Sequence, residues 1–118
     1  MKILLRRNEQ IIKEGEAELQ KTIHMVVGRL FLTNQRFVFA AHRHNIRAGD
    51  TEIELSNIRS IEKCWTKLLG HIPIFPNSLA VRTRTGGIYR FVLYKRSAWI
   101  KTIESQNIVL SRNGRGYA

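Results

Sequence analysis

Residues 28–39, GRLFLTNQRFVF, decide the fold of this 118-residue chain. Two apolar runs flank a polar centre, TNQR at residues 33–36. A loop at Asn34-Gln35 would place four large side chains on one face of a hairpin, although a longer turn stays open because Gln tolerates positive φ less well than Asn. The predicted pairs are Leu30 with Phe39 and Leu32 with Phe37. The stretch therefore predicts a hairpin that builds the core.

A second hairpin is predicted at residues 78–94, SLAVRTRTGGIYRFVLY. A three-residue loop, Thr85-Gly86-Gly87, gives a cleaner register than a two-residue loop and puts Gly87 where positive φ is wanted. The predicted pairs are Leu79 with Leu93, Val81 with Phe91 and Thr83 with Tyr89. On the other face Arg82 would then lie opposite Arg90, with Arg84 close by.

Like charges directly opposite each other destabilise a hairpin by up to about 1 kcal/mol. Two interpretations of the arginine pair stay open. One is an anion, such as a phosphate, held by the guanidinium groups. The other is a carboxylate from a neighbouring strand, with Glu62 as the candidate, or simple solvation of splayed side chains.

The rest of the chain predicts further strands and one helix. Strand-like patterns occupy residues 15–23, 51–56 and, less regularly, 57–65. Residues 1–14 predict a short helix or a strand lead-in, and residues 42–50 and 67–77 predict loops, the second of which holds both prolines. Residues 95–107 predict a helix with Ser97 as N-cap. Its expected apolar face comprises Trp99, Ile100 and Ile103. Many short strands before one helix indicate a mainly β barrel or sandwich with the helix against it.

Length and composition fit one soluble domain. No apolar run approaches the roughly 20 residues that span a bilayer, and the start, MKILLRRNEQ, lacks the apolar region of a signal peptide. The single cysteine, Cys64, excludes an internal disulfide and fits a reducing compartment. We therefore expect a cytoplasmic protein.

The net charge of +11 is unevenly distributed. Residues 1–62 contain ten lysines and arginines against eight acidic residues, whereas residues 63–118 contain ten against one, Glu104. This asymmetry favours an anionic partner, namely a lipid headgroup, a nucleic acid or an acidic protein surface, although the charge would also serve solubility alone.

Three segments in order resemble the GRAM and bacterial pleckstrin-homology-like (PH-like) domains. They are GRLFLTNQRFVF, then HNIRAGDTEIELSNIRSIEK, then IPIFPNSLAVRTRTGGIYRFVLYKRSAWIKTI. The resemblance spans about residues 12–104 and implies a bent seven-stranded antiparallel barrel or sandwich capped by one C-terminal helix. It implies a single domain over residues 1–118, with a core of about 12–107 and a tail at 108–118.

In that fold Trp99 and Ile103 would plug the barrel. The residues expected to fill it are Leu30, Leu32, Phe37, Phe39, Ile53, Leu55, Val81 and Phe91. The family's loop between the first two strands would fall at residues 24–27, HMVV, with Lys21 before it and Arg29 after it. This loop lacks the basic phosphoinositide motif, so no residue is carried over as a headgroup ligand.

No catalytic motif is found in the sequence. His42 and His44 form a His-x-His pair, but a metal site needs three or four ligands. Cys64 is expected to be a buried or half-buried thiol. We therefore expect no enzyme, no metal and no cofactor.

The resemblance implies a binding module, and the charge favours peripheral association with anionic membrane lipids at the inner face of the membrane. The candidate residues are Lys63, Lys67, Arg82, Arg84, Arg90, Lys95 and Arg96. A protein-interaction adaptor is the alternative, with a peptide at a barrel edge or between strand and helix. Nucleic-acid binding ranks third, because Phe31, Tyr89 and Tyr94 form no evident stacking platform.

The apolar residues of segment 65–75 allow two interpretations. They are Trp65, Leu68, Leu69, Ile72, Ile74 and Phe75. Next to Lys63 and Lys67 they would either dip into a lipid interface or pack under the edge of the barrel.

Overall fold

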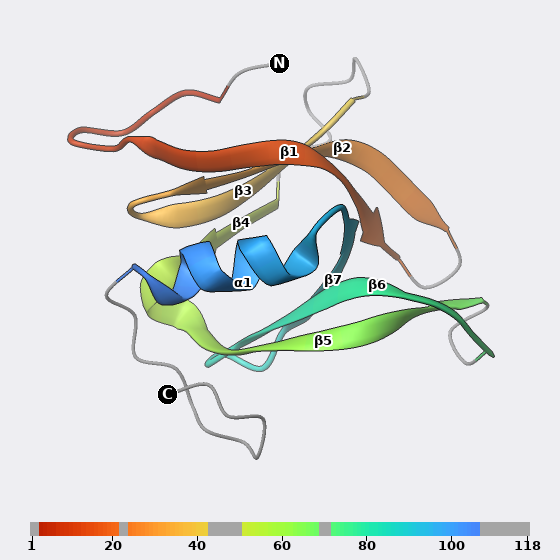
Figure 1. Cartoon of the computed structure of the whole chain (residues 1–118). Helices are drawn as coiled ribbons and strands as arrows, with labels where there is room; N and C mark the ends of the chain where they lie inside the picture. The colour runs from red at the N-terminus through yellow and green to blue at the C-terminus, as the bar shows by residue number, and fades with distance from the viewer. Residues whose placement is uncertain (1–2, 22–23, 43–50, 69–71, 107–118) are drawn as a thin grey trace.

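A computed structural model describes residues 3–21, 24–42, 51–68 and 72–106, with the backbone alone for residues 65–68 and 72–76. Seven strands form one antiparallel sheet in the order β4-β3-β2-β1-β7-β6-β5. The elements are β1 Ile11–Gln20, β2 Met25–Thr33, β3 Arg36–Ala41, β4 Thr51–Glu54, the 3-10 turn η2 Leu55–Asn57, β5 Ile58–Leu68, β6 Ile72–Thr83, β7 Ile88–Leu93 and α1 Arg96–Glu104. The predicted mainly β fold with one C-terminal helix is confirmed. The seven strands form an open, bent sheet rather than a closed barrel (Figure 1).

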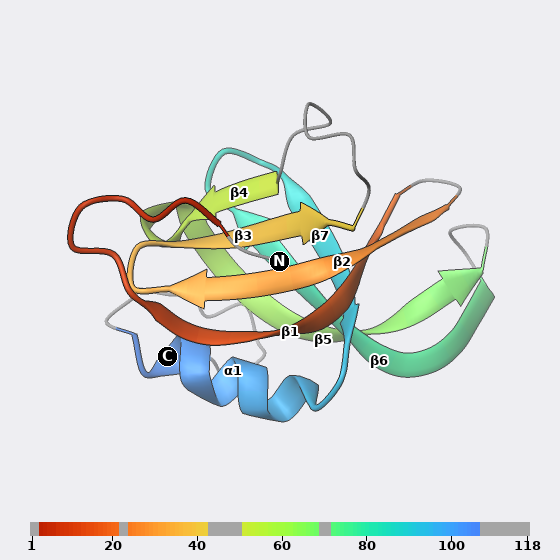
Figure 2. The same ribbon diagram turned by 90° about the horizontal axis from the view of Figure 1, so that it is seen from above.

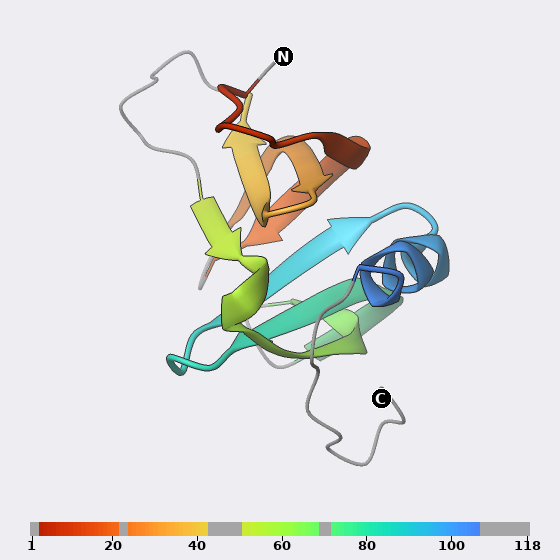
Figure 3. The same cartoon turned by 90° about the vertical axis from the view of Figure 1, so that its left-hand side faces the viewer.

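The core lies inside the bend, between the two halves of the sheet. Figure 3 shows β2 and β3 above, β5 to β7 below and α1 alongside the open side. All eight residues expected to fill the interior belong to one buried cluster, together with Trp99, Ile100 and Ile103 of α1. Trp99 packs 6.4 Å from Phe37 between ring centroids, so the helix closes the core as the apolar spacing predicts.

The β2–β3 hairpin has the predicted register. Leu30 pairs with Phe39 and Leu32 with Phe37, with a two-residue connection. A Cβ on Gly28 would lie 2.4 Å from the carbonyl oxygen of Ala40, so only glycine allows this close approach between β2 and β3. The opening stretch is therefore a core-building hairpin.

The register predicted for the β6–β7 hairpin is wrong by two residues. Leu79 pairs with Phe91 and Val81 with Tyr89, because the loop is Arg84-Thr85-Gly86 rather than 85–87. Gly86, not Gly87, has the positive φ, at 98°. The Thr83 hydroxyl accepts the Gly87 N–H at 2.7 Å and fixes the turn one residue early. A register shift of two residues leaves every side chain on the same face of the sheet, so the residues predicted to face the core still do so.

The predicted loop at 67–77 is wrong: β5 continues to Leu68 and β6 begins at Ile72, so residues 69–71, outside the described residues, connect two strands. Pro73 is paired with Lys67 of β5, while β7 pairs with β6 only from Ser78 to Arg82. A proline is tolerated here because no third strand in the described chain needs its missing N–H.

Two smaller predictions also need correction. The N-cap of α1 is Lys95, with φ 55°, rather than Ser97. Residues 24–27, predicted as a loop, belong mainly to β2, and β1 and β2 are connected by residues 21–24. Residues 3–10 form no helix and lead into β1, which begins at Ile11, in agreement with the second alternative for residues 1–14. His44, most of the 42–50 loop and the 108–118 tail lie outside the described residues.

Candidate anion-binding surface

The outer face of the sheet, turned away from the core, carries Arg82 on β6. The register places Arg82 between Ser60 of β5 and Ile88 of β7. Its Nε lies 3.4 Å from the Glu62 carboxylate, so the neighbouring strand supplies a counter-charge as one of the two interpretations foresaw. The predicted Arg82–Arg90 pairing is wrong, because Arg90 lies opposite Ala80.

Arg90 nevertheless shares the outer face with Arg82 as its diagonal neighbour across the hairpin. In the described part of the chain no acidic group lies within ion-pair distance of Arg90. Arg84 is exposed in the adjoining β6–β7 turn. We call Arg82, Arg84 and Arg90 the basic face, and Glu62 forms an ion pair with Arg82 of this face.

Two further candidates lie at the start of α1. Lys95 is exposed, with its Nζ 5.9 Å from the centroid of the Tyr94 ring. Arg96 has a structural role: its Nη1 donates to the carbonyl oxygens of Cys64 at 2.8 Å and Ser78 at 3.1 Å. These bonds attach the helix to β5 and β6. Nothing in the sequence distinguishes Arg96 from its neighbours, because the carbonyls it binds lie 32 and 18 residues away.

The last two candidates lie on β5. Lys63 is exposed and alternates with Glu62, so it points to the other side of the strand. Lys67 pairs through its backbone with Pro73, and its side chain lies outside the described residues. The seven predicted residues therefore form three groups, the basic face, the start of α1 and β5, rather than one cluster.

The polar centre of the opening stretch serves a different purpose, which the sequence did not reveal. Each of its four residues binds residues 4–10, part of the segment 3–10 that we call the N-terminal strap. Thr33 Oγ1 donates to Glu9 at 2.6 Å, and the Gln35 amide donates to the Arg7 carbonyl at 2.9 Å. The Asn34 side chain accepts the Gln10 N–H and donates to the Asn8 carbonyl.

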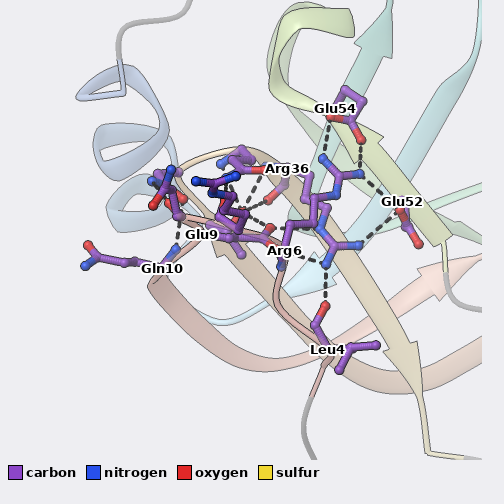
Figure 4. A network of polar contacts seen from close by, with 12 residues as sticks. Leu4, Arg6, Glu9, Gln10, Arg36, Glu52 and Glu54 are labelled. Carbon is purple, nitrogen blue, oxygen red and sulfur yellow. Dashed lines mark hydrogen bonds and ion pairs between the residues drawn. The ribbon is translucent and has the colours of Figure 1, made fainter.

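Arg36 is the centre of this network (Figure 4). Its guanidinium donates to Glu9 at 2.8 and 3.0 Å and to the Leu4 carbonyl at 2.8 Å, and Glu52 lies 3.1 Å away. Arg6 donates to Glu54 at the end of β4. The strap also covers the outer face of β2 and β3, where Ile3 packs on Phe31, Val38 and Ala40.

The hydrogen bond from Arg36 lowers the pKa of Glu9 from 4.5 to about 2, against the opposing effect of burial. The Glu9 side chain has no exposed surface, and the Arg36 side chain is 7% exposed. A buried ion pair stays stable only when its remaining polar atoms are hydrogen-bonded, as they are here by Thr33, the Arg6 amide and Leu4.

The remaining arginine of the N-terminal strands is also in ion pairs. Arg29 contacts Glu14 and Glu16, each at 2.9 Å. Glu16 also contacts His42 at 2.9 Å, and the hydrogen bond from His42 lowers the Glu16 pKa. Arg29, which flanks the region matching the family's basic loop, therefore has its charge compensated.

A shallow depression of about 890 Å³ lies where β1, β7 and the start of α1 meet. Its lining includes Val27, which is 52% exposed, together with Val92, Tyr94 and Lys95. Glu16 and Glu18 also line it, so this hollow has mixed charge and is not an anion pocket.

Metal ligands do not gather in the described residues: no three histidine, cysteine or acidic side chains lie together there. The Cys64 side chain is half-buried, as the sequence predicts. None of the described helices is long and apolar enough to span a membrane.

The comparisons with known proteins agree with this fold. The GRAM domain family model matches residues 1–109. A C-terminal domain of an unknown protein from Leishmania infantum has a TM-score of 0.68 at 19% identity, covering 83% of this chain and 84% of that one. No curated protein sequence is significantly similar.

Two PH domains are also similar in structure. The N-terminal PH domain of Vps36 has a TM-score of 0.59 at 17% identity, covering 87% of this chain and 80% of that one. The Slm1 PH domain, solved in complex with phosphoserine, has a TM-score of 0.55 at 14% identity, covering 81% and 91%.

Proposed function

The chain belongs to the GRAM domain family, whose members are typically binding modules for lipids or proteins, and we propose that it associates peripherally with anionic membrane lipids without catalysing a reaction. The proposed location is the cytoplasmic face of a membrane. The proposed contacts are Lys63, Lys67, Arg82, Arg84, Arg90 and Lys95, with Arg96 adding charge while it holds the start of α1.

The observation that carries this proposal is the uneven compensation of charge. Arg6, Arg29 and Arg36 in the N-terminal half are all in ion pairs, whereas Lys63, Arg90 and Lys95 have no ion pair within the described residues. Each Lys or Arg close to an anionic membrane adds roughly 1 kcal/mol of attraction. The phosphoserine bound by the Slm1 PH domain supports a phosphate-bearing ligand for this fold.

Nucleic acid fits the geometry less well than a lipid surface. Unpaired bases bind proteins by stacking on exposed aromatic rings. Phe31 is buried beneath the strap, Tyr89 is half-buried against the core, and Tyr94 is exposed at the start of α1. These three rings therefore do not form one stacking platform.

A protein partner remains the second candidate because of the depression between β1, β7 and α1. Its apolar lining, the exposed Tyr94 and its charges of both signs suit a peptide better than a phosphate. A partner bound there would be insensitive to changes on the basic face.

Co-sedimentation with liposomes tests the proposal. Phosphatidylcholine vesicles with rising phosphatidylserine content, in about 150 mM salt, show whether binding increases with the negative charge of the membrane. Arg82→Glu/Arg90→Glu removes two attractive charges and adds two repulsive ones. We expect it to weaken binding by at least about 30-fold, which corresponds to roughly 2 kcal/mol.

The matched control is Arg7→Glu/Lys21→Glu, which changes the net charge equally in the N-terminal half, where both residues are exposed. A loss confined to the basic-face variant supports the proposal. Equal losses in both variants would mean that binding depends only on net charge and not on the basic face. Absence of binding at every lipid composition would favour the protein partner.

A further inference from the structure

A further arginine, Arg59, lies at the start of β5 and is missing from the contacts predicted from the sequence. Ile58 pairs with Thr83 of β6 and Ser60 pairs with Arg82, so two residues of β5 advance against one of β6. Arg59 is therefore the extra residue of a β-bulge, next to the buried Ile58, and its side chain is exposed. A bulge re-aims a side chain, and this one sets Arg59 and Ser60 together opposite Arg82 of the basic face.

The donors of this bulge are largely unused within the described chain. The Arg59 side chain makes no ion pair or hydrogen bond to another described residue. Arg82 contacts Glu62 at 3.4 Å, which is longer than the distance of about 2.7–2.9 Å typical of a charge-assisted hydrogen bond. The buried Ser60 hydroxyl, beside Arg82, has no hydrogen-bond partner among the described residues. Two guanidinium groups therefore have donors to spare for an added anion.

The β6–β7 turn is held against the same end of β5 (Figures 2 and 3). The Arg84 N–H donates to the Asn57 carbonyl at 2.8 Å, and the Asn57 side-chain amide donates to the Thr85 hydroxyl at 3.2 Å. These bonds join the turn that carries the exposed Arg84 to the residues just before Arg59. Arginines from β5, β6 and the turn thus lie at one corner of the sheet, on backbone that is already hydrogen-bonded.

We propose that Arg59, Arg82 and Arg84 together hold one phosphate group, with Arg59 as a contact that only the bulge provides. A guanidinium binds two phosphate oxygens through its planar fork of N–H donors. A phosphate monoester presents three oxygens and about −1.5 to −2 charges at pH 7, so it suits several arginines better than a phosphodiester does. The inference rests on the proposed function and deepens it, because it places a discrete phosphate site within a surface otherwise held by general attraction.

Charge-preserving variants distinguish a discrete site from general attraction. Lysine keeps the charge of arginine but loses the planar fork. On phosphatidylcholine vesicles containing phosphatidic acid, we expect co-sedimentation to weaken at least about threefold for Arg59→Lys and at least about tenfold for Arg59→Gln. Thermal unfolding should not change, because the side chain is exposed.

Arg7 supplies the matched control. It is exposed on the strap, and its side chain has no ion pair within the described residues. Arg7→Lys and Arg7→Gln make the same two chemical changes away from the bulge, and each should alter binding by less than about twofold.

Two probes test the chemistry of the ligand. Vesicles of phosphatidic acid, whose headgroup is a phosphate monoester, are compared with phosphatidylserine vesicles of equal zeta potential, and the first should bind at least about threefold more tightly. Inorganic phosphate titrated into the free protein tests the same group without a membrane. The expected NMR shifts lie at residues 57–60 and 82–86 and disappear in Arg59→Gln.

The failure of this inference is distinct from the failure of the proposed function. Equal binding by Arg59→Lys and the unchanged protein, or a preference for phosphatidic acid that survives Arg59→Gln, overturns the site and leaves lipid association standing. Phosphate shifts that depend on Arg59 without binding to any vesicle keep the site for a soluble phosphate ester and overturn the proposed function. Absence of binding to vesicles and to phosphate overturns both.

Discussion

The two halves of the sheet differ in how many of their described lysines and arginines are in ion pairs. In β1 to β4 and the strap, Arg6, Arg29 and Arg36 each contact carboxylates, and Glu9 and Arg36 do so out of contact with water. In β5 to β7 and α1, Arg82 has Glu62, while Lys63, Arg90 and Lys95 have no ion pair in the described residues. The ion pairs of Arg6, Arg29 and Arg36 join elements of the first half, whereas we propose that the cations without an ion pair in the second half contact a partner.

This difference teaches that net charge alone does not locate a binding surface. Both halves contain arginines on strands, and only their partners distinguish them. Changes in the N-terminal half should therefore affect stability, and changes on the basic face should affect binding.

The largest expected effect is that of Glu9→Gln. It removes the fully buried carboxylate that the Arg36 guanidinium binds and leaves only the half-exposed Glu52 as an acidic partner, and breaking a buried ion pair typically costs about 3 kcal/mol or more. Urea unfolding measures the loss. Glu14→Gln, at a carboxylate that is 40% exposed beside Arg29, is the control and should cost under about 1 kcal/mol. Equal costs would contradict the distinction between buried and surface pairs.

Acid should reveal the same pair. The Glu9 pKa is about 2 in the folded protein against an ordinary 4.5, so the unfolded chain binds more protons between these values. The free energy of unfolding should therefore fall as pH decreases from 4.5 toward 2. Unfolding curves at several pH values should show a weaker dependence for Glu9→Gln; an unchanged slope would mean that Glu9 is not the group responsible.

A smaller effect on stability should distinguish Arg96, which holds the start of α1, from the adjacent exposed Lys95. Arg96→Met removes the charged donor from two carbonyls and should cost about 2 kcal/mol. Lys95→Met, at the adjacent exposed residue, should cost no more than about 0.5 kcal/mol. Thermal unfolding of the two variants measures both costs. Equal losses of stability would contradict the structural role of Arg96.

The smallest expected effect on stability is at the basic face itself. Arg90→Gln should change the free energy of unfolding by about 0.5 kcal/mol, because no ion pair is lost within the described chain. Arg82→Gln, which loses a partly exposed contact to Glu62, should cost under about 1 kcal/mol. Chemical denaturation checks both, and a cost of several kcal/mol would move these arginines to the structural group.

The sequence by itself determined the core and the order of its elements. Alternation along GRLFLTNQRFVF fixed which side chains face inward, and the register followed because a slip by one residue would expose them all. The helical spacing of Trp99, Ile100 and Ile103 predicted the buried face of α1 for the same reason. These are local patterns, so they can be read without knowing what packs against them.

Only the tertiary structure decided how the polar residues are used. The β6–β7 register depended on a threonine hydroxyl that fixed the turn, and Thr33, Asn34, Gln35 and Arg36 find their partners on a strap some 24 to 32 residues away. Arg36, Arg82 and Arg96 look alike in the sequence. Arg36 forms a buried ion pair, Arg82 forms a partly exposed ion pair, and Arg96 donates to two backbone carbonyls. These roles differ because the free energy of a charge depends on its surroundings in space.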